Sequence, residues 1–123
     1  MRPRHRVVVI DDHDQIRDLL RIAIGADDRF EWVGGAANGA DGVALISREQ
    51  PDAVILDFEM PDIDGIEVLR TVRADGCTAV VVLYTAADAG PVALAHGADA
   101  AFPKGAPLPK ILDVLARLAD ESD

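Results

Sequence analysis

The sequence predicts an α/β fold, a doubly wound parallel sheet of five strands with helices on both faces. Short, nearly continuous apolar runs alternate strictly with amphipathic helical segments along the chain, five of each. Such alternation is typical of a parallel sheet whose connections are helices. The apolar runs also lack a polar residue at every second position, as expected of strands that are buried on both faces.

Length and composition indicate one domain, residues 1–123. Half of the residues are hydrophobic (50%), yet no apolar run approaches the roughly 20 residues of a membrane span. The apolar run at 7–10 is too short for a signal-peptide core. A single cysteine, Cys77, excludes an internal disulfide and favours a cytoplasmic protein. With 22 acidic and 12 basic residues the formal charge is −10, which disfavours nucleic-acid binding by this chain alone.

In the first half of the chain we expect strands at 7–10, 31–37 and 53–56. Asp14 is expected to cap a helix that Gly25 ends, and residues 40–49 form the second helix. The apolar residues of both helices recur every three or four positions. They are Ile16, Leu19, Leu20, Ala23 and Ile24 in the first helix and Val43, Ala44 and Ile46 in the second.

The second half continues the alternation. Apolar residues at 66, 69 and 72 lie on one side of a helix that ends at Asp75 and Gly76. Residues 79–84 form another buried strand. After a loop of small residues at 86–90, Pro91 starts a helix of under two turns. Residues 100–102 are a brief strand, and we expect Phe102 to point into the core. The last helix is striped by Leu108, Ile111, Leu112, Leu115 and Leu118.

The stretch 54–65 carries the strongest functional signal. Its apolar run stops at Asp57, which therefore lies where a buried strand reaches the surface. Pro61 cannot continue the strand, and Gly65 allows the backbone to approach its surroundings closely. Ligands of open α/β sheets bind at the carboxyl ends of the strands, so Asp57 is well placed for chemistry.

Polar residues follow the other strands in the same way: Asp11 and Asp12, Thr85, and Lys104. Taken singly, each fits a helix cap, a turn or a solvated surface residue. Together they converge on one edge of a parallel sheet. Carboxylates this close repel one another unless a cation lies among them, and oxygen ligands suit Mg²⁺. A carboxylate beside Mg²⁺ can attack phosphorus, with a lysine and a hydroxyl stabilising the phosphoryl oxygens.

These motifs resemble those of response-regulator receiver domains, the phosphoacceptor modules of two-component signalling. The resemblance covers nearly the whole chain and rests on Ile10-Asp11-Asp12, Asp57-Phe58-Glu59-Met60-Pro61 with Gly65, Tyr84-Thr85-Ala86, Gly97-Ala98-Asp99, and Lys104. It implies the flavodoxin-like strand order 2-1-3-4-5. It also implies an acceptor that phosphorylates itself, rather than a turnover enzyme, and that controls transcription or another output through an effector domain, a downstream protein or homodimerisation.

The resemblance assigns a role to each residue of the set. Asp57 accepts a phosphoryl group from a histidine kinase or a phosphotransfer protein. Asp12 and Asp57 hold Mg²⁺ directly, Asp11 assists through water, and the backbone carbonyl of Glu59 is a further ligand. Thr85 and Lys104 bind phosphoryl oxygens and carry the conformational switch.

The sequence departs from the family pattern on the output side. Ala101 stands where receivers usually have an aromatic residue, and Gly105 stands where a proline usually follows the lysine. The segment between Thr85 and Lys104 is also shorter than usual by about one helical turn. We therefore expect the phosphorylation chemistry to be intact and the usual aromatic switch to be altered.

Two other functions fit parts of the pattern. A haloacid-dehalogenase-type phosphohydrolase needs Asp-x-Asp after its first strand, where this chain has Asp11-Asp12-His13-Asp14, and the chain has no room for a cap domain. A receiver-like module that binds partners without phosphorylation would account for Ala101 and the short fourth helix. Turnover of phosphomonoesters would support the first function, and a spectrum that does not respond to beryllofluoride would support the second.

We predict that phosphorylation is read out by ordering residues 86–97. The loop consists of small residues and the helix after it is too short to be stable without packing, so local opening costs little. Beryllofluoride, which mimics the phosphoryl group, should slow amide hydrogen exchange in this segment. Protection that is already high in the free protein, or unchanged by beryllofluoride, would contradict this readout.

Overall fold

The computed structural model describes residues 3–85 and 90–122. Strands and helices alternate along the chain as β1 (His5–Ile10), α1 (Asp14–Gly25), β2 (Phe30–Ala36), α2 (Gly39–Glu49), β3 (Ala53–Asp57), α3 (Gly65–Ala74), β4 (Val80–Thr85), α4 (Gly90–Ala95), β5 (Ala100–Pro103) and α5 (Leu108–Glu121). All neighbouring strands are parallel, in the order β2-β1-β3-β4-β5. Both the fold class and the strand order are confirmed.

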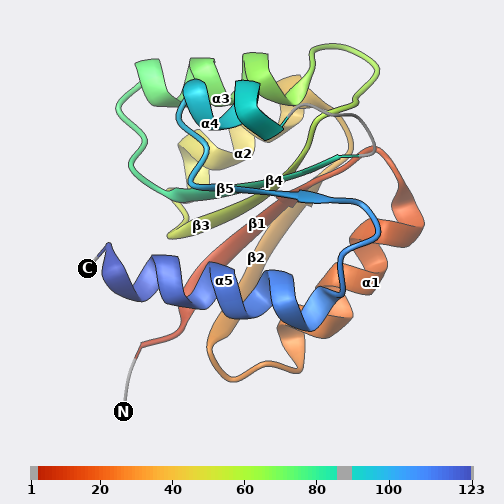
Figure 1. Ribbon diagram of the computed structural model, residues 1–123, viewed down its shortest axis with the longest axis vertical. Coiled ribbons are helices and arrows are strands. Elements are labelled where there is room, and N and C mark those ends of the chain that lie inside the picture. Colours follow the sequence, from red (N-terminus) through yellow and green to blue (C-terminus); the bar gives the residue numbers. More distant parts are fainter. Residues whose placement is uncertain (1–2, 86–89, 123) are drawn as a thin grey trace.

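The sheet is covered on both faces (Figure 1). Helices α1 and α5 lie on one face, and α2, α3 and α4 lie on the other. Successive residues of each buried strand pack into the hydrophobic cores on opposite faces of the sheet. Val7, Val9 and Ile55 pack toward α1 and α5, whereas Val8 and Ile10 pack toward α2 and α3. This division explains why the strands read as continuous apolar runs.

Two predictions for the first helix were wrong. Asp14 is the first residue of α1 and not its cap; His13 holds the cap position without a side-chain bond. Asp14 instead pairs with Arg17 at 2.6 Å. Leu19 lies on the apolar stripe of α1 but is 53% exposed, because the sheet contacts the side of the helix that carries Leu20 and Ile24.

Helix α2 is rotated from the expected orientation. Its buried residues are Gly39, Gly42, Leu45 and Ile46, and Ala44 is exposed. The reason is a close approach at Gly42, where an added Cβ atom would lie 2.6 Å from the Ile10 side chain. The helix therefore rests on the sheet through a glycine, which a search for apolar residues overlooks.

The fourth helix is short, as expected. Helix α4 has six residues, of which Ala93 is buried and Val92 and Leu94 are each 51% exposed. We predicted that phosphorylation orders residues 86–97. Most of the loop in this segment, residues 86–89, lies outside the described residues, so the ordering stays a prediction. Phe102 packs against the core on the α1 and α5 side, which confirms its expected direction.

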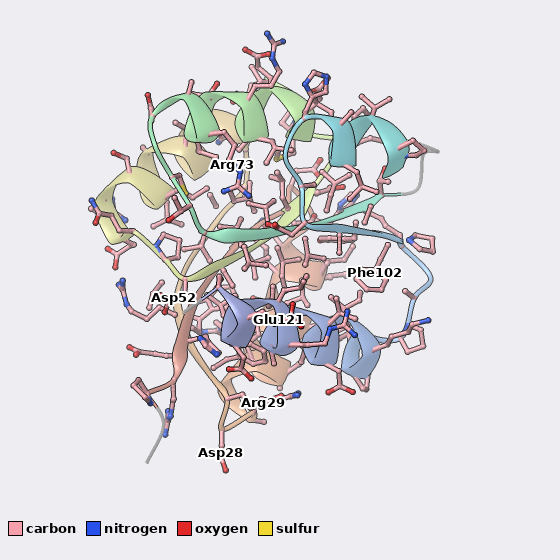
Figure 2. All side chains as sticks on the ribbon, turned by 60° about the vertical axis from the view of Figure 1, so that its left-hand side comes forward. Asp28, Arg29, Asp52, Arg73, Phe102 and Glu121 are labelled. Carbon is pink, nitrogen blue, oxygen red and sulfur yellow. The ribbon has the colours of Figure 1, made fainter. Side chains whose placement is uncertain are left out.

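Arg73 ties this half of the sheet together from α3 (Figure 2). Its guanidinium donates to the backbone carbonyls of Cys77, Ala79 and Gly97 and pairs with Asp99 at 3.1 Å. Asp99 in turn accepts the backbone N–H of Val81 at 2.8 Å. One side chain thus joins α3 to the start of β4 and to the turn between α4 and β5.

Candidate functional site

The site lies at the carboxyl edge of the sheet, where four strands deliver one polar group each. Asp11 follows β1, Asp57 ends β3, Thr85 ends β4, and Lys104 follows β5. The register of the strands sets these groups side by side, because Asp57 is level with Tyr84 on β4, and Thr85 is level with Pro103 on β5. Asp11, Asp57 and Thr85 are all buried.

Asp57 is at the centre of the site and is fully buried, with 0% of its surface exposed. Its Oδ2 lies 3.2 Å from the Lys104 ammonium, and its Oδ1 accepts the backbone N–H of Glu59 at 3.3 Å. The Lys104 ammonium also lies 5.4 Å from the centre of the Tyr84 ring. Lys104 is thus held between a carboxylate and an aromatic face, each of which attracts a cation.

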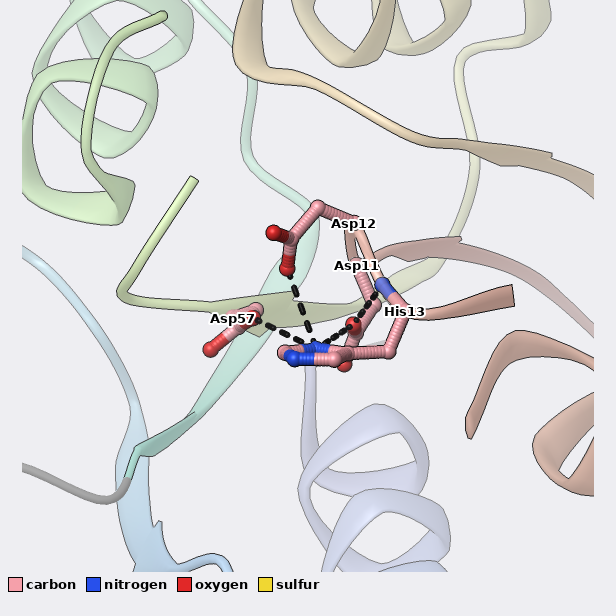
Figure 3. Close-up of side chains that lie close together, drawn as sticks. All are labelled: Asp11, Asp12, His13 and Asp57. Carbon is pink, nitrogen blue, oxygen red and sulfur yellow. Dashed lines mark hydrogen bonds and ion pairs between the residues drawn. The ribbon is translucent and has the colours of Figure 1, made fainter. Parts of the chain in front are cut away.

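The acidic pair lies on the other side of Asp57, and His13 lies among the carboxylates (Figure 3). The His13 Nδ1 is 3.0 Å from Asp11 Oδ1, 3.1 Å from Asp12 Oδ1 and 4.0 Å from Asp57 Oδ2. The His13 backbone N–H also donates to Asp11 Oδ1 at 2.7 Å. One donor atom from each of the four residues lies within 4.8 Å of the others.

This donor set fits a divalent cation. Three carboxylates within this distance suit a hard ion that takes oxygen ligands. Asp11 is fully buried, and within residues 3–85 and 90–122 its Oδ2 has no hydrogen-bond partner. A buried carboxylate oxygen without a donor is costly, and a metal ion would supply its missing partner.

The loop after Asp57 is held in place by two close contacts. A Cβ atom on Gly65 would lie 2.5 Å from the carbonyl oxygen of Asp57, so this position needs glycine, as the sequence indicated. The Asp62 carboxylate accepts the backbone N–H groups of Gly39 and Ala40 at 2.8 Å each. These bonds at the start of α2 lower the pKa of Asp62.

The comparison with protein families identifies this arrangement. The family model of the response regulator receiver domain matches residues 7–116. The chain belongs to this family. It is a receiver domain of two-component signalling.

Solved structures agree with this assignment. The signal receiver domain of NarL from Mycobacterium tuberculosis is 31% identical, with a TM-score of 0.91 over 97% of this chain and 98% of that one. The response regulator domain of Thermotoga maritima CheB is 25% identical, with a TM-score of 0.85 over 96% of this chain and 98% of that one.

Curated relatives are longer than this receiver domain. A protein-glutamate methylesterase/protein-glutamine glutaminase from Nocardioides is 38% identical over 109 residues, which are 85% of this chain and 30% of that protein. A nitrate/nitrite response regulator protein homolog from Haemophilus influenzae is 33% identical over 89 residues, which are 72% of this chain and 43% of that protein. The chain thus spans less than half the length of either relative.

The receiver domain brings together most of the residues that the sequence singled out. Asp11, Asp12 and Asp57 have donor atoms within 4.8 Å of one another, and Lys104 pairs with Asp57. Thr85 is buried at the adjacent strand end, and Glu59 contacts Asp57 through its backbone N–H. His13 was missed, although its place directly after Asp12 could have marked it.

None of the described helices is both long and apolar enough to cross a membrane.

The electrostatics of the receiver site centre on Asp57. Burial, then repulsion from Asp11, raises the pKa of Asp57 from 3.8 to about 6, against the opposing effect of Lys104. Ionised Asp57 is therefore disfavoured in the folded state. The resulting loss of stability begins as the pH rises past about 4 and is complete above about 6.

We predict that Asp57→Asn stabilises the metal-free receiver domain at pH 7. Removing a buried charge with this raised pKa should increase the free energy of unfolding by about 1 to 3 kcal/mol. Urea unfolding in EDTA would measure the gain, which should shrink toward pH 4. Asp18→Asn, at an exposed position on α1, is the matched control and should change little. Equal or lower stability of Asp57→Asn at pH 7 would contradict the prediction.

Proposed function

We propose that this receiver domain accepts a phosphoryl group on Asp57 from a histidine kinase or a phosphotransfer protein. The observation that carries the proposal is the environment of the Asp57 carboxylate. It is fully buried at a strand end, with the Lys104 ammonium 3.2 Å away on one side. On the other side lie the acidic pair and His13. A nucleophile, a fixed cation and a candidate metal site thus share one pocket.

The transfer uses these groups in distinct roles. A carboxylate oxygen of Asp57 attacks the phosphorus of phosphohistidine, the new P–O bond forms as the P–N bond breaks, and the departing histidine nitrogen takes up a proton. With a pKa of about 6, Asp57 is mostly ionised at neutral pH, as a nucleophile must be. Lys104 and the Thr85 hydroxyl bind the phosphoryl oxygens and stabilise their charge.

The oxygen donors of the pocket support a site for Mg²⁺. Asp12 and Asp57 would hold the ion directly, Asp11 through water, and the Glu59 backbone carbonyl as a further ligand. When bound, Mg²⁺ supplies positive charge that offsets the repulsion between the carboxylates and the incoming phosphoryl group. The unpartnered Oδ2 of Asp11 supports this assignment.

Residues 1–123 form one receiver domain that switches an output and does not turn over substrate. The output is an effector domain, a downstream protein or a second copy of the chain, and transcription is one process it could control. The cytoplasmic location suggested by the single cysteine stays a prediction. A phosphorylation-independent module is the second candidate, favoured by Ala101 at the position usually taken by an aromatic residue.

We predict that Asp57 is the single phosphorylated residue. Incubation with acetyl phosphate and Mg²⁺ should label one site, because the Asp57 carboxylate is buried at the strand end and lies 3.2 Å from the Lys104 ammonium. The acyl phosphate can be trapped and mapped by mass spectrometry. Asp57→Ala should abolish the label and Asp52→Ala, directly before the first residue of β3, should keep it. A label on Asp11 or Asp12, or one that survives Asp57→Ala, would refute the assignment.

We predict that phosphorylation depends on Mg²⁺. The pocket must admit a group of about −2 charge beside three carboxylates, which needs a compensating cation. Asp12→Ala should remove the effect of Mg²⁺, whereas Asp11→Ala should only weaken it. The rate of labelling is measured across a Mg²⁺ titration. Equal labelling of the wild type in EDTA would rule out the metal requirement.

A further inference from the structure

His13 has no role in the proposed phosphoryl transfer, yet its ring lies against the carboxylates of the pocket (Figure 3). The ring is at the mouth of the site, with its side chain 54% exposed, whereas Asp11 and Asp57 are fully buried. Its Nδ1 approaches an oxygen of each of three carboxylates. Of the two ring nitrogens, Nδ1 therefore faces the acidic cluster.

The spacing of these atoms matches a shared coordination sphere. Two donors about 2.1 Å from one octahedral ion lie about 3.0 Å apart at right angles and about 4.2 Å apart when opposed. The Nδ1 of His13 is 3.1 Å from the oxygen of Asp12 and 4.0 Å from that of Asp57, the two carboxylates that would hold the ion directly. Its 3.0 Å approach to Asp11 Oδ1 is a hydrogen bond. An ion among the carboxylates would therefore have this nitrogen within reach, with little movement of the ring.

The backbone keeps His13 at this position. The Asp11 N–H donates to the Ala36 carbonyl at 3.0 Å, and the Asp11 carbonyl accepts from Arg17 Nη1 at 2.7 Å. The His13 N–H donates to Asp11 Oδ1 at 2.7 Å. These bonds fix the segment that carries the acidic pair and the ring, so the ligands are arranged before an ion binds.

A separate observation indicates that the cluster takes a cation. The Asp11 carboxylate is fully buried, and within the described part of the chain its Oδ2 finds no donor. A hydrogen bond from His13 satisfies only the other oxygen, Oδ1. A metal ion bound by the imidazole nitrogen would bring a coordinated water that can donate to the buried Asp11 carboxylate.

We propose that His13 is a metal ligand through Nδ1, which makes the pocket a mixed nitrogen and oxygen site. The inference rests on the proposed metal-dependent function and deepens it. Imidazole suits first-row transition ions, whereas Mg²⁺ prefers oxygen. His13 therefore raises the affinity of the pocket for ions that favour imidazole, such as Ni²⁺, and adds little for Mg²⁺, so it sets the metal preference of this receiver domain.

Pulsed electron paramagnetic resonance of the Mn²⁺-loaded protein tests the bond directly. The wild type should show hyperfine coupling from a directly bound ¹⁴N nucleus, and His13→Ala should lose that coupling while still binding Mn²⁺. His96→Ala is the matched control, because His96 is exposed beyond α4, and it should keep the coupling. Absence of ¹⁴N coupling in the wild type, or its persistence in His13→Ala, overturns the proposal.

Calorimetry then tests the preference among metals. Ni²⁺ binding at this pocket is recognised because Mg²⁺ competes with it. His13→Ala should weaken the affinity for this Ni²⁺ by roughly tenfold or more. It should change Mg²⁺ affinity by less than about twofold. An unchanged Ni²⁺ affinity overturns the proposal, as does a rise in Mg²⁺ affinity, which would make the ring a competitor of the ion. Either result leaves Mg²⁺-dependent labelling of Asp57 intact, whereas labelling that is independent of Mg²⁺ removes the proposed function itself.

Discussion

The buried carboxylate of Asp57 is the constraint on which the rest of the site depends. Burial and the neighbouring Asp11 raise its pKa, and Lys104, 3.2 Å away, only partly offsets them. The site therefore holds negative charge in excess of its fixed cation. That imbalance favours a metal ion among the carboxylates.

The register of the parallel strands brings the polar residues at the strand ends into a single pocket. Asp11, Asp57, Thr85 and Lys104 are far apart in sequence, yet each stands at the carboxyl end of a neighbouring strand. The loop after Asp57 is then held by Gly65, which packs on the Asp57 carbonyl, and by Asp62, which bonds to the first turn of α2. Helix α2 is thereby linked to the segment that follows the nucleophile.

The output side of the domain has small residues where the first turn of α4 meets β5. A Cβ atom built on Gly90, the first residue of α4, would lie 3.5 Å from the Cβ of Ala101. The short helix thus begins in van der Waals reach of Ala101, the position at which the sequence resemblance led us to expect an aromatic residue. The aromatic residues of this edge, Tyr84 and Phe102, are neighbours across β4 and β5 and pack toward α1 and α5.

The sequence by itself determined the order of strands and helices, the polar strand ends and the need for Gly65, because periodicity and turn chemistry are local properties. Only the tertiary structure decided which side of α2 faces the sheet, since that depends on how closely Gly42 lets the helix approach Ile10. It also decided the direction of the His13 ring. A residue's place after a strand predicts its neighbourhood, whereas the atoms its side chain meets depend on packing between elements distant in sequence.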